Sequence, residues 1–254
     1  MKLGPSTPLS TDTAMAPGPD APPLAAAADP AAGSMALLRL IQLVSPALPI
    51  GAYAYSHGLE WAAEAGWVRS EAQADAWIRG LLQGPWAHLD IPVLARMMAA
   101  RAGGDEAALE AWSELLASSR ESAELQAEDR FMGQALARLL GDLGVPGMER
   151  WASAPRASFP AAWACAAVYW GIGLQPAAWG LLWTYAEHQV AAAVKLVPLG
   201  QTAGQRMLAR LGAAIPPAAA TGLALGDADI GAGAPGLGIA AALHETQYTR
   251  LFRS

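Results

Sequence analysis

The chain has 254 residues, of which 54% are hydrophobic and 15% are charged, and its formal net charge is −6. Charged residues usually make up about a quarter of a soluble protein, so this chain has to bury apolar surface in a core, a partner or a lipid phase. Its acidity argues against a general nucleic-acid-binding protein, which needs a basic face to neutralise phosphates. The single cysteine, Cys165, excludes an intramolecular disulfide and a cysteine-based zinc site, and its alanine-rich surroundings indicate a buried, inert thiol.

Residues 1–34 differ in composition from the rest of the chain. They hold seven prolines and nine alanines but only four charged residues, without a periodic apolar pattern. This composition predicts a disordered arm rich in proline and alanine, and its prolines interrupt any apolar stretch that could serve as a secretory signal. We therefore expect a cytoplasmic protein with a reduced thiol and one folded domain at residues 35–254.

The remainder of the chain predicts helices and no sheet, because apolar residues recur with helical spacing and no window alternates with period two. The expected helices, in chain order, cover about residues 35–44, 56–65, 70–83, 90–103, 105–117, 119–140, 159–170, a segment from about 176 through 195, 201–211, 216–225 and 235–244. Their number and short connections favour an all-α fold, a single irregular bundle of about ten helices.

Residues 157–186 form an uncharged stretch of thirty residues, longer than the twenty or so needed to cross a bilayer. Pro160, Gly171, Gly173 and Pro176 divide it, and no cluster of basic residues flanks it. The pattern favours two buried helices, with a membrane-associated protein as the alternative.

Motifs for catalysis or nucleotide binding are weak. No phosphate-binding loop of the Gly-x4-Gly-Lys-Ser/Thr type is present, and the glycine-rich stretch 231–236 follows no predicted strand. Ser56 precedes His57 but fits a helix N-cap better than a nucleophile, since adjacent residues do not readily face each other. We predict no catalytic residue.

One spacing permits a metal-site alternative. His57, Glu60 and Glu64 stand at i, i+3 and i+7, along one side of a predicted helix. Such carboxylate–imidazole sites normally need matching ligands from a second helix, and none repeats the spacing. A helical metal-binding protein or enzyme that uses these three residues stays an alternative, while polar contacts at a helix start are favoured.

The charged run from Arg120 to Arg130 has two readings. It could be an acidic docking face, or an ordinary solvated helix surface on which Arg120 and Glu124 pair at i, i+4. The spacing favours the solvated surface.

A polar stripe is more informative. Thr184, His188 and Lys195 share one face of an otherwise apolar helix, and Lys195 is the only lysine after residue 34. Gln201, Gln205 and Arg206 follow one turn later. A structural polar seam and a binding surface fit this pattern equally well.

The last residues, Tyr248 and Arg250 to Arg253, combine aromatic, aliphatic and guanidinium groups where most chains carry small polar residues. These residue types dominate interface hot spots, so the segment predicts a peptide that docks on a partner. Packing on its own domain is the alternative.

Together, several of these segments resemble the UreF family of urease accessory proteins, in colinear order from about residue 35 to the end. The resemblance rests on Leu48-Pro-Ile-Gly-Ala-Tyr53-Ala-Tyr55-Ser56-His-Gly58-Leu-Glu60-Trp61, Leu89-Asp90-Ile-Pro92, Ser119-Arg120-Glu121 with Glu124-Leu125 and Glu128-Asp129, Val194-Lys195-Leu-Val-Pro198-Leu-Gly200-Gln201 and His244-Glu-Thr-Gln-Tyr248 with Arg250-Leu-Phe-Arg-Ser254. His57 departs from the glutamine that relatives often carry there, which puts a histidine-based role in doubt.

The resemblance implies an all-α accessory protein that is not an enzyme. Proteins of this family dimerise, bind the accessory protein UreD (also called UreH) and recruit the GTPase UreG, and the assembly helps to load nickel into apo-urease. No cofactor is then bound permanently: the complex handles nickel, and the partner binds GTP. No nucleic acid or membrane is expected as a partner.

The resemblance also locates partner contacts on the C-terminal tail and around Lys195. Combined with the patterns above, the predicted partner-binding residues are Lys195, Gln201, Gln205, Arg206, Glu245, Tyr248, Arg250, Leu251, Phe252 and Arg253. Tyr53, Tyr55 and Glu60 are predicted as interface or structural residues. A role in regulating the GTPase would need a group near its phosphates, which Lys195, Gln201 or Arg206 could supply.

Overall fold

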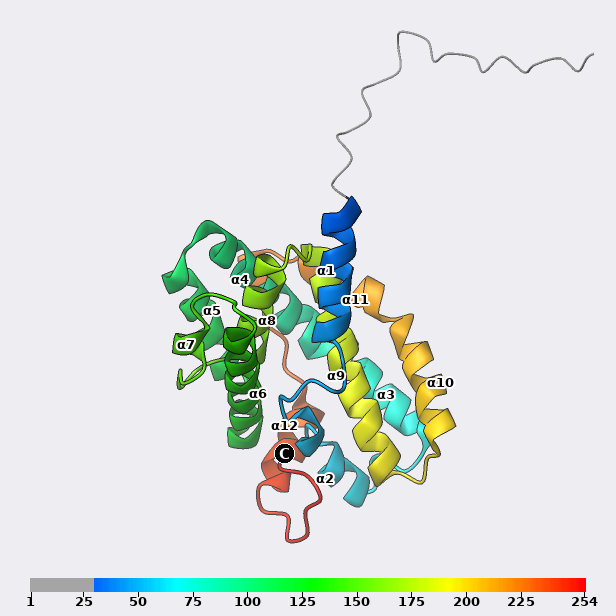
Figure 1. Cartoon of the computed structure of the whole chain (residues 1–254). Coiled ribbons are helices and arrows are strands. Elements are labelled where there is room, and N and C mark those ends of the chain that lie inside the picture. The colour runs from blue at the N-terminus through cyan, green and yellow to red at the C-terminus, as the bar shows by residue number, and fades with distance from the viewer. Residues whose placement is uncertain (1–29) are drawn as a thin grey trace, which may run out of the picture.

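A computed structural model describes the backbone of residues 30–254 and the side chains from residue 33 onward. Over this range the chain is helical and contains no strand, which confirms the predicted all-α class (Figure 1). The predicted arm lies outside the described residues up to residue 29. Helix α1 begins at Pro30, so the last five residues of that predicted arm are helical instead.

The helices follow the predicted order. They are α1 Pro30–Leu43, η1 Ala52–Ala54, α2 Leu59–Glu64, α3 Glu71–Leu81, η2 Leu82–Asp90, α4 Ile91–Gly103, α5 Glu106–Ser118, α6 Ala123–Asp142, α7 Met148–Trp151, α8 Phe159–Tyr169, α9 Leu174–Leu196, α10 Gln201–Gly212, α11 Ile215–Leu223, η3 Asp227–Asp229 and α12 Pro235–His244. Several begin where a hydroxyl or carboxylate accepts a backbone N–H as an N-cap, as Ser70, Asp105, Ser122 and Ser158 do.

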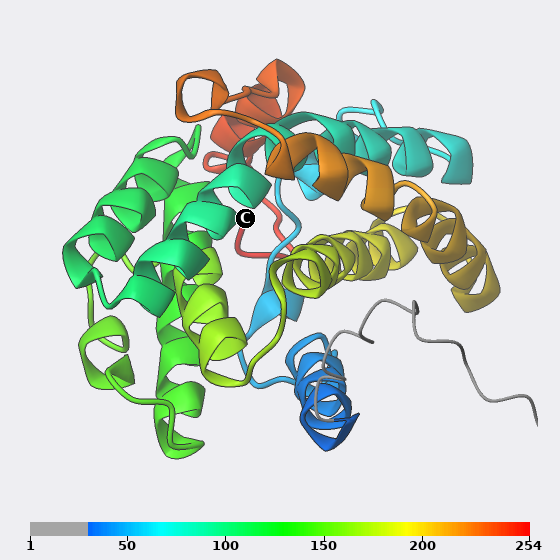
Figure 2. The same ribbon diagram turned by 90° about the horizontal axis from the view of Figure 1, so that it is seen from above.

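Helix α9 is the centre of the bundle. It packs against α1, α2, α3, α4, α8, α10 and α11. In Figure 2, α4, α5, α6 and α8 lie on one side of it, and α3, α10 and α11 lie on the other. Because neighbours cover most of its circumference, its sequence is apolar nearly all round, as expected for a buried helix.

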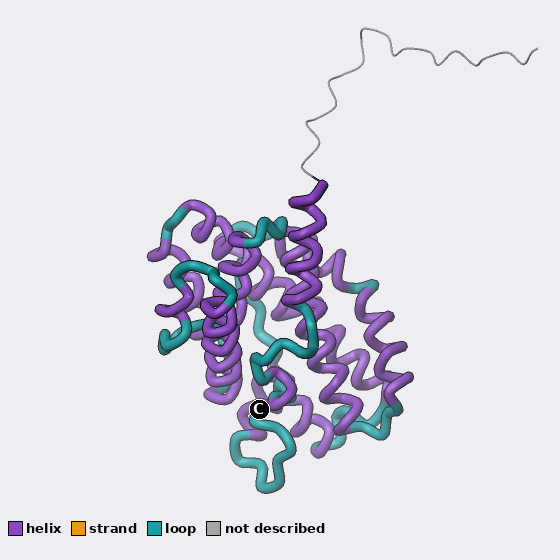
Figure 3. The backbone as a smooth tube through the Cα atoms, viewed as in Figure 1, coloured by secondary structure: helices purple, strands orange, loops and turns teal. Residues whose placement is uncertain are grey.

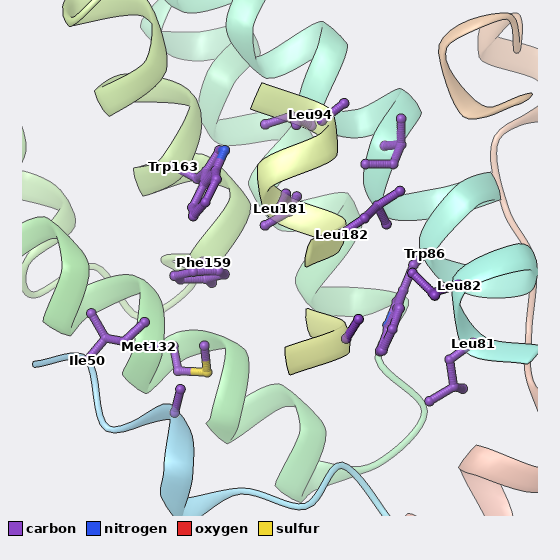
Figure 4. Close-up of a cluster of buried hydrophobic side chains, with 14 of the residues drawn as sticks. Ile50, Leu81, Leu82, Trp86, Leu94, Met132, Phe159, Trp163, Leu181 and Leu182 are labelled. Carbon is purple, nitrogen blue, oxygen red and sulfur yellow. The ribbon is translucent and has the colours of Figure 1, made fainter. Parts of the chain in front are cut away.

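The core joins α9 to α4 and α8. Figure 4 shows Phe159 and Trp163 of α8 facing Leu181 of α9, near Leu94 of α4. The Trp163 ring donates its Nε1–H to the Ala177 carbonyl at 3.1 Å, so this large side chain is buried with its polar atom satisfied. Cys165 lies in the same region and is fully buried, as predicted, and burial raises the pKa of its thiol to about 12.

Helices α8 and α9 account for the uncharged stretch at residues 157–186. Among the described residues, no helix combines the length and apolar character that crossing a bilayer requires. The alanine and tryptophan side chains of α8 are buried against neighbouring helices, as the two-helix interpretation predicted.

The helix predicted at residues 70–83 ends at a kink. The segment η2 follows α3 directly, but Gly84 within it has non-helical backbone torsion angles (φ −97°, ψ −110°), so two helices meet there. Pro85 has no N–H to donate, which suits its place directly after the kink. The residues after the kink are helical and lead into α4, and Trp86 among them is buried.

Candidate functional site

Residues 245–254, called the tail below, leave α12 and fold back onto their own domain. Figure 3 shows the tail as a loop at the end of the molecule opposite the start of α1. The Arg253 amide donates to the Ala54 carbonyl at 2.7 Å, and the Ser56 amide donates to the Ser254 carbonyl, also at 2.7 Å. The tail therefore pairs with the segment that connects η1 to α2.

Glu60 holds the middle of the tail. This buried carboxylate accepts the Leu251 amide at 2.6 Å and the Phe252 amide at 2.8 Å. Its position follows from the start of α2, where His57 (φ 54°) and Gly58 (φ 74°) both adopt left-handed backbone geometry. The predicted N-cap at Ser56 is wrong, because α2 starts later, at Leu59, with Gly58 as its N-cap and no capping side chain; the Ser56 hydroxyl nevertheless accepts the Glu60 amide at 3.2 Å.

Helix α6 supplies the second set of contacts. Glu124 pairs with the Arg250 guanidinium, whose Nη1 also donates to the His244 carbonyl at 3.3 Å. Glu245 caps the start of the same helix, because its Oε1 accepts the Ala123 amide at 3.0 Å and the Glu124 amide at 3.4 Å. A carboxylate at a helix N-terminus also interacts favourably with the helix dipole.

Farther along α6, Glu128 holds the last residue. It accepts the Ser254 hydroxyl at 2.6 Å and lies 3.5 Å from Nδ1 of His57. Burial by itself raises the pKa of Glu128, but His57 and the Ser254 hydroxyl outweigh it and hold that pKa below its ordinary value. Glu128 is therefore an ionised acceptor for the tail.

The aromatic ring of Phe252 is buried. It is 6% exposed, and the Lys195 ammonium lies 5.2 Å from its centroid, within cation–π range. In contrast, Leu251 is 65% exposed and Tyr248 is completely exposed. The tail therefore is anchored to the domain through Phe252 and exposes the side chains of Tyr248 and Leu251.

The two predicted tyrosines lie beside the tail. Tyr55 is buried, and burial is the main cause of its raised pKa, which the nearby Arg253 partly offsets. Tyr53 is partly exposed, and its ring packs edge-on against His188, with centroids 5.5 Å apart. Burial lowers the pKa of His188 to about 4, so this imidazole is neutral near pH 7.

The remaining predicted partner-binding residues form a separate group on α10. Gln201, Gln205 and Arg206 are all exposed. Helix α10 packs against α9 and α3, and Arg206 pairs with Glu71 of α3 at 3.7 Å. The fold thus brings Lys195 to the tail while it directs the α10 side chains to another part of the surface.

The solvated-surface interpretation of the charged run is wrong for most of its members. Arg120 precedes α6 and is buried, where Asp90 Oδ1 lies 2.7 Å from its Nη2 and Asp129 Oδ2 lies 3.3 Å from its Nε. Burial acts to lower the pKa of Arg120, but the two carboxylates raise it well above its ordinary value. Glu124 and Glu128 face the tail, so the predicted Arg120–Glu124 pair does not form.

The structure does not bring together the three residues of the metal alternative. His57 faces Glu128, Glu60 holds tail amides, and Glu64 accepts the Gln247 side-chain amide at 2.6 Å. Among the residues that the structure describes, no cluster of three or more histidine, cysteine, aspartate or glutamate side chains is arranged to hold a metal ion.

Three residues of the tail site were not among the predicted site residues: Glu124, Glu128 and His244. The sequence places each of them in a motif or a charged run, but not at the tail. Glu124 and Glu128 stand at i, i+4, which places them on one face of α6, and that spacing was the available signal. The sequence does not predict that the tail lies against that face, because the tail is more than a hundred residues farther along the chain.

The fold and the site define an all-helical protein in which carboxylates of α2 and α6 hold a peptide segment of the same chain. Comparison with known proteins gives the family. The model of the UreF family matches residues 68–212. Three proteins named urease accessory protein UreF are close relatives. The one from Alkalilimnicola ehrlichii is 51% identical over 220 residues, which cover 87% of this chain and 96% of that protein. The one from Azoarcus sp. is 50% identical over 231 residues, covering 89% and 99%. The one from Hahella chejuensis is 44% identical over 220 residues, covering 87% and 99%.

The chain belongs to the UreF family of urease accessory proteins. This confirms the resemblance inferred from the sequence. Its relatives are named as accessory proteins of urease and not as enzymes, which agrees with the prediction that this chain is not an enzyme.

Proposed function

We propose that this chain is a maturation chaperone that, as a homodimer, bridges an accessory protein of the UreD (UreH) type and the GTPase UreG, and so promotes GTP-dependent insertion of nickel into apo-urease. Nickel is the cargo of the complex and GTP is the nucleotide of the partner, so the chain itself needs no resident cofactor. We expect this work to take place in the cytoplasm.

The observation that carries the proposal is the geometry of the tail. Contacts to Glu60, Glu124 and Glu128 fix its path, while Tyr248 and Leu251 are exposed. Large apolar side chains on a pre-ordered segment lose little conformational entropy on binding, which favours their use as contact residues. This supports the tail, with Lys195 beside it, as the surface for the UreD-type partner.

The exposed polar group of α10 suits a second contact. GTPases accept a cation near the phosphates, or a residue that orients the attacking water, from proteins that regulate them. Gln201, Gln205 and Arg206 offer such groups on a rigid helix, and Arg206 is held by one weak pair with Glu71. We assign this surface to the GTPase.

The homodimer is supported by an apolar face at the other end of the molecule. Four residues of α1 (Met35, Leu37, Leu38 and Ile41) are each more than half exposed. Beside them a groove of about 470 Å³ runs between α1, α9 and α11, lined by Leu40, Trp179, Trp183 and Ile215 among others. An exposed apolar area of this kind on a soluble protein marks an interaction site, and a second copy brings a matching apolar helix.

Co-purification tests the assignment of the tail. A tagged UreD-type partner should retain the full chain and should fail to retain a chain that lacks residues 245–254. A variant with both Tyr248 and Leu251 changed to serine keeps the buried contacts and should still lose most of the binding. Retention of both altered chains at the level of the full chain would refute the assignment.

A further inference from the structure

A cavity of about 40 Å³ adjoins the residues that hold the end of the tail. Its wall includes Tyr55, His57 and Glu128 from the tail site, together with Arg120 and Gln189 from the interior. Aromatic and aliphatic side chains form much of the remainder. One water molecule needs about 10–15 Å³ of such space, so a polar cavity of this size has room for about two or three.

Gln189 of α9 brings to this wall an acceptor that lacks a donor. The side chain is 3% exposed, and its Nε2 donates to the Ser56 carbonyl at 2.8 Å. Because a carbonyl oxygen can only accept, this bond fixes which end of the amide is the nitrogen. Oε1 is the other end, and no donor among the described residues makes a hydrogen bond to it. A buried acceptor of this kind is costly unless water supplies the donor.

Arg120 has donors to spare on the same wall. A guanidinium carries more N–H groups than the hydrogen bonds of Arg120 to Asp90 and Asp129 use. Water can accept from such an N–H group and can donate to an oxygen such as Oε1 of Gln189. A bound cation would face the charge of Arg120, and a bound anion would face Glu128 and Asp129. The wall therefore favours a neutral ligand of the size of water that both donates and accepts.

Gln189 also connects the cavity to the tail. The Ser56 carbonyl that it holds belongs to residues 55–58, called the connector below, and the Ser56 amide donates to the Ser254 carbonyl at 2.7 Å. Within the connector, His57 has left-handed backbone geometry (φ 54°), which is uncommon for a residue other than glycine. The connector therefore depends on contacts that hold it, and Gln189 supplies one of them from the interior.

We propose that the cavity is a water-binding site and that Gln189 is the positioning residue of the connector. Water donates to Oε1, Nε2 holds the Ser56 carbonyl, and the connector is thereby kept in the geometry that receives the tail. Loss of the Gln189 amide leaves the Ser56 carbonyl without this donor and shifts the tail toward a released state. The inference rests on the proposed function only for what the tail binds.

A crystal structure of the free chain, at a resolution that shows ordered water, tests the water site. We expect water in the cavity, with one molecule within hydrogen-bond distance of Oε1 of Gln189. A dry cavity, which would take up xenon in a pressurised crystal, would overturn the water site. A donor of the protein itself on Oε1 would overturn it as well.

Tryptic cleavage after Arg250 measures how often the tail is released, because Glu60 holds the Leu251 amide of that peptide bond in the docked state. When opening and closing are fast, the cleavage rate follows the population of the open form. The Gln189→Met variant keeps an unbranched side chain but has no N–H for the Ser56 carbonyl. We expect this variant to be cleaved after Arg250 at least about fivefold faster than the unaltered chain, with the fragments identified by mass spectrometry.

Thr184 provides the matched control on the same helix. It is 3% exposed, and its hydroxyl donates to the Gly180 carbonyl at 2.9 Å within α9, away from the connector. Thr184→Val also removes a buried hydrogen bond, but it should leave the cleavage after Arg250 unchanged, which separates positioning of the connector from a general loss of stability. Circular dichroism verifies the fold of both variants.

Equal cleavage after Arg250 in the Gln189→Met variant and the unaltered chain would overturn the role of Gln189, and so would equal acceleration in the Thr184→Val variant. No partner is present in these measurements. Failure of a UreD-type protein to bind the tail would therefore refute the proposed function and leave this inference standing.

Discussion

Lys195 contacts the tail because it lies in the last turn of α9. Its ammonium lies over the ring of Phe252, so it both stabilises the docked tail and adds a cation to the tail surface. At an exposed site such a contact contributes about 0.5–1 kcal/mol.

Lys195→Ala should therefore leave the fold intact and weaken tail docking slightly, while it lowers urease activation clearly. The measurement is urease activity in cells that carry the remaining urease genes, with circular dichroism of the purified chain to verify the fold. Lys195→Arg retains a cation over the ring and should retain most of the activity. Full activation by the alanine variant would remove Lys195 from the mechanism.

We expect His188 to make the free energy of unfolding depend on pH. Burial lowers its pKa from 6.5 to about 4, so between these values the unfolded chain binds a proton that the folded chain does not. The contribution of His188 to the free energy of unfolding is thus present above about pH 6.5 and declines as the pH falls toward 4, by at most about 1.4 kcal/mol per pH unit.

Urea denaturation at about pH 4.5 and pH 7 checks this. The unaltered chain should lose more stability on acidification than the His188→Gln variant does, because glutamine has no proton to gain. Equal losses in the two chains would show that His188 is not responsible. Other titrating groups are common to both chains and cancel in the difference.

At the residue scale, the sequence predicted what depends on neighbours in the chain. The buried thiol of Cys165 follows from its alanine-rich surroundings, and the capping role of Ser70 follows from local hydrogen-bond chemistry. The roles of Glu124 and Glu128 could not be predicted in this way. Helical spacing places them away from the core, and whether solvent or another segment covers them depends on the tail, which arrives from the far end of the chain.

Among the elements, most helices could be predicted because their caps and apolar spacing are local signals. The helix predicted at residues 70–83 does end at the kink at Gly84, but the helical residues of the π-helical segment Leu82–Asp90 that follow Pro85 could not be predicted, because a Gly-Pro pair is a local signal for a turn. Helix α7, Met148–Trp151, was also missed. It is a single turn, too short for any periodicity to be visible.

The contact between this π-helical segment and α11 depends on a glycine. A Cβ atom on Gly222 would lie 2.2 Å from the Ala87 carbonyl oxygen, much closer than van der Waals contact. Gly222→Ala should therefore force the two helices apart and lower the free energy of unfolding by about 1–3 kcal/mol.

Gly80→Ala is the matched control in α3. Nothing lies within 4 Å of its added Cβ, so the change should instead raise the free energy of unfolding by about 0.5–1 kcal/mol. Denaturant unfolding of the two variants measures both effects. Two variants of equal stability would contradict the close approach of α11.

At the scale of the whole molecule, the tail surface and the apolar face of α1 lie at opposite ends (Figure 1). A dimer formed through α1 would thus leave the tail of each copy free for a partner. This arrangement is what a bridging protein requires, since self-association and partner binding do not compete for the same surface.

Ile41→Glu tests the assignment of the dimer. Ile41 is 55% exposed and borders the groove, so the variant with glutamate at this position should fold normally. It should be a monomer, because the glutamate charge would be desolvated without a partner in an apolar interface. Light scattering after size exclusion measures the mass. Leu115→Glu, at a 40% exposed position on α5, should leave the dimer intact. A persistent dimer in the Ile41 variant would move the interface elsewhere.

The account depends most on the claim that the chain matures urease through what its tail binds. The most direct measurement is the nickel content of urease purified from cells that carry the other urease genes together with the intact chain, no chain, or a folded chain that lacks residues 245–254. We predict that urease from cells with the truncated chain carries as little nickel as urease from cells without the chain. Nickel loading equal to that obtained with the intact chain would contradict the account.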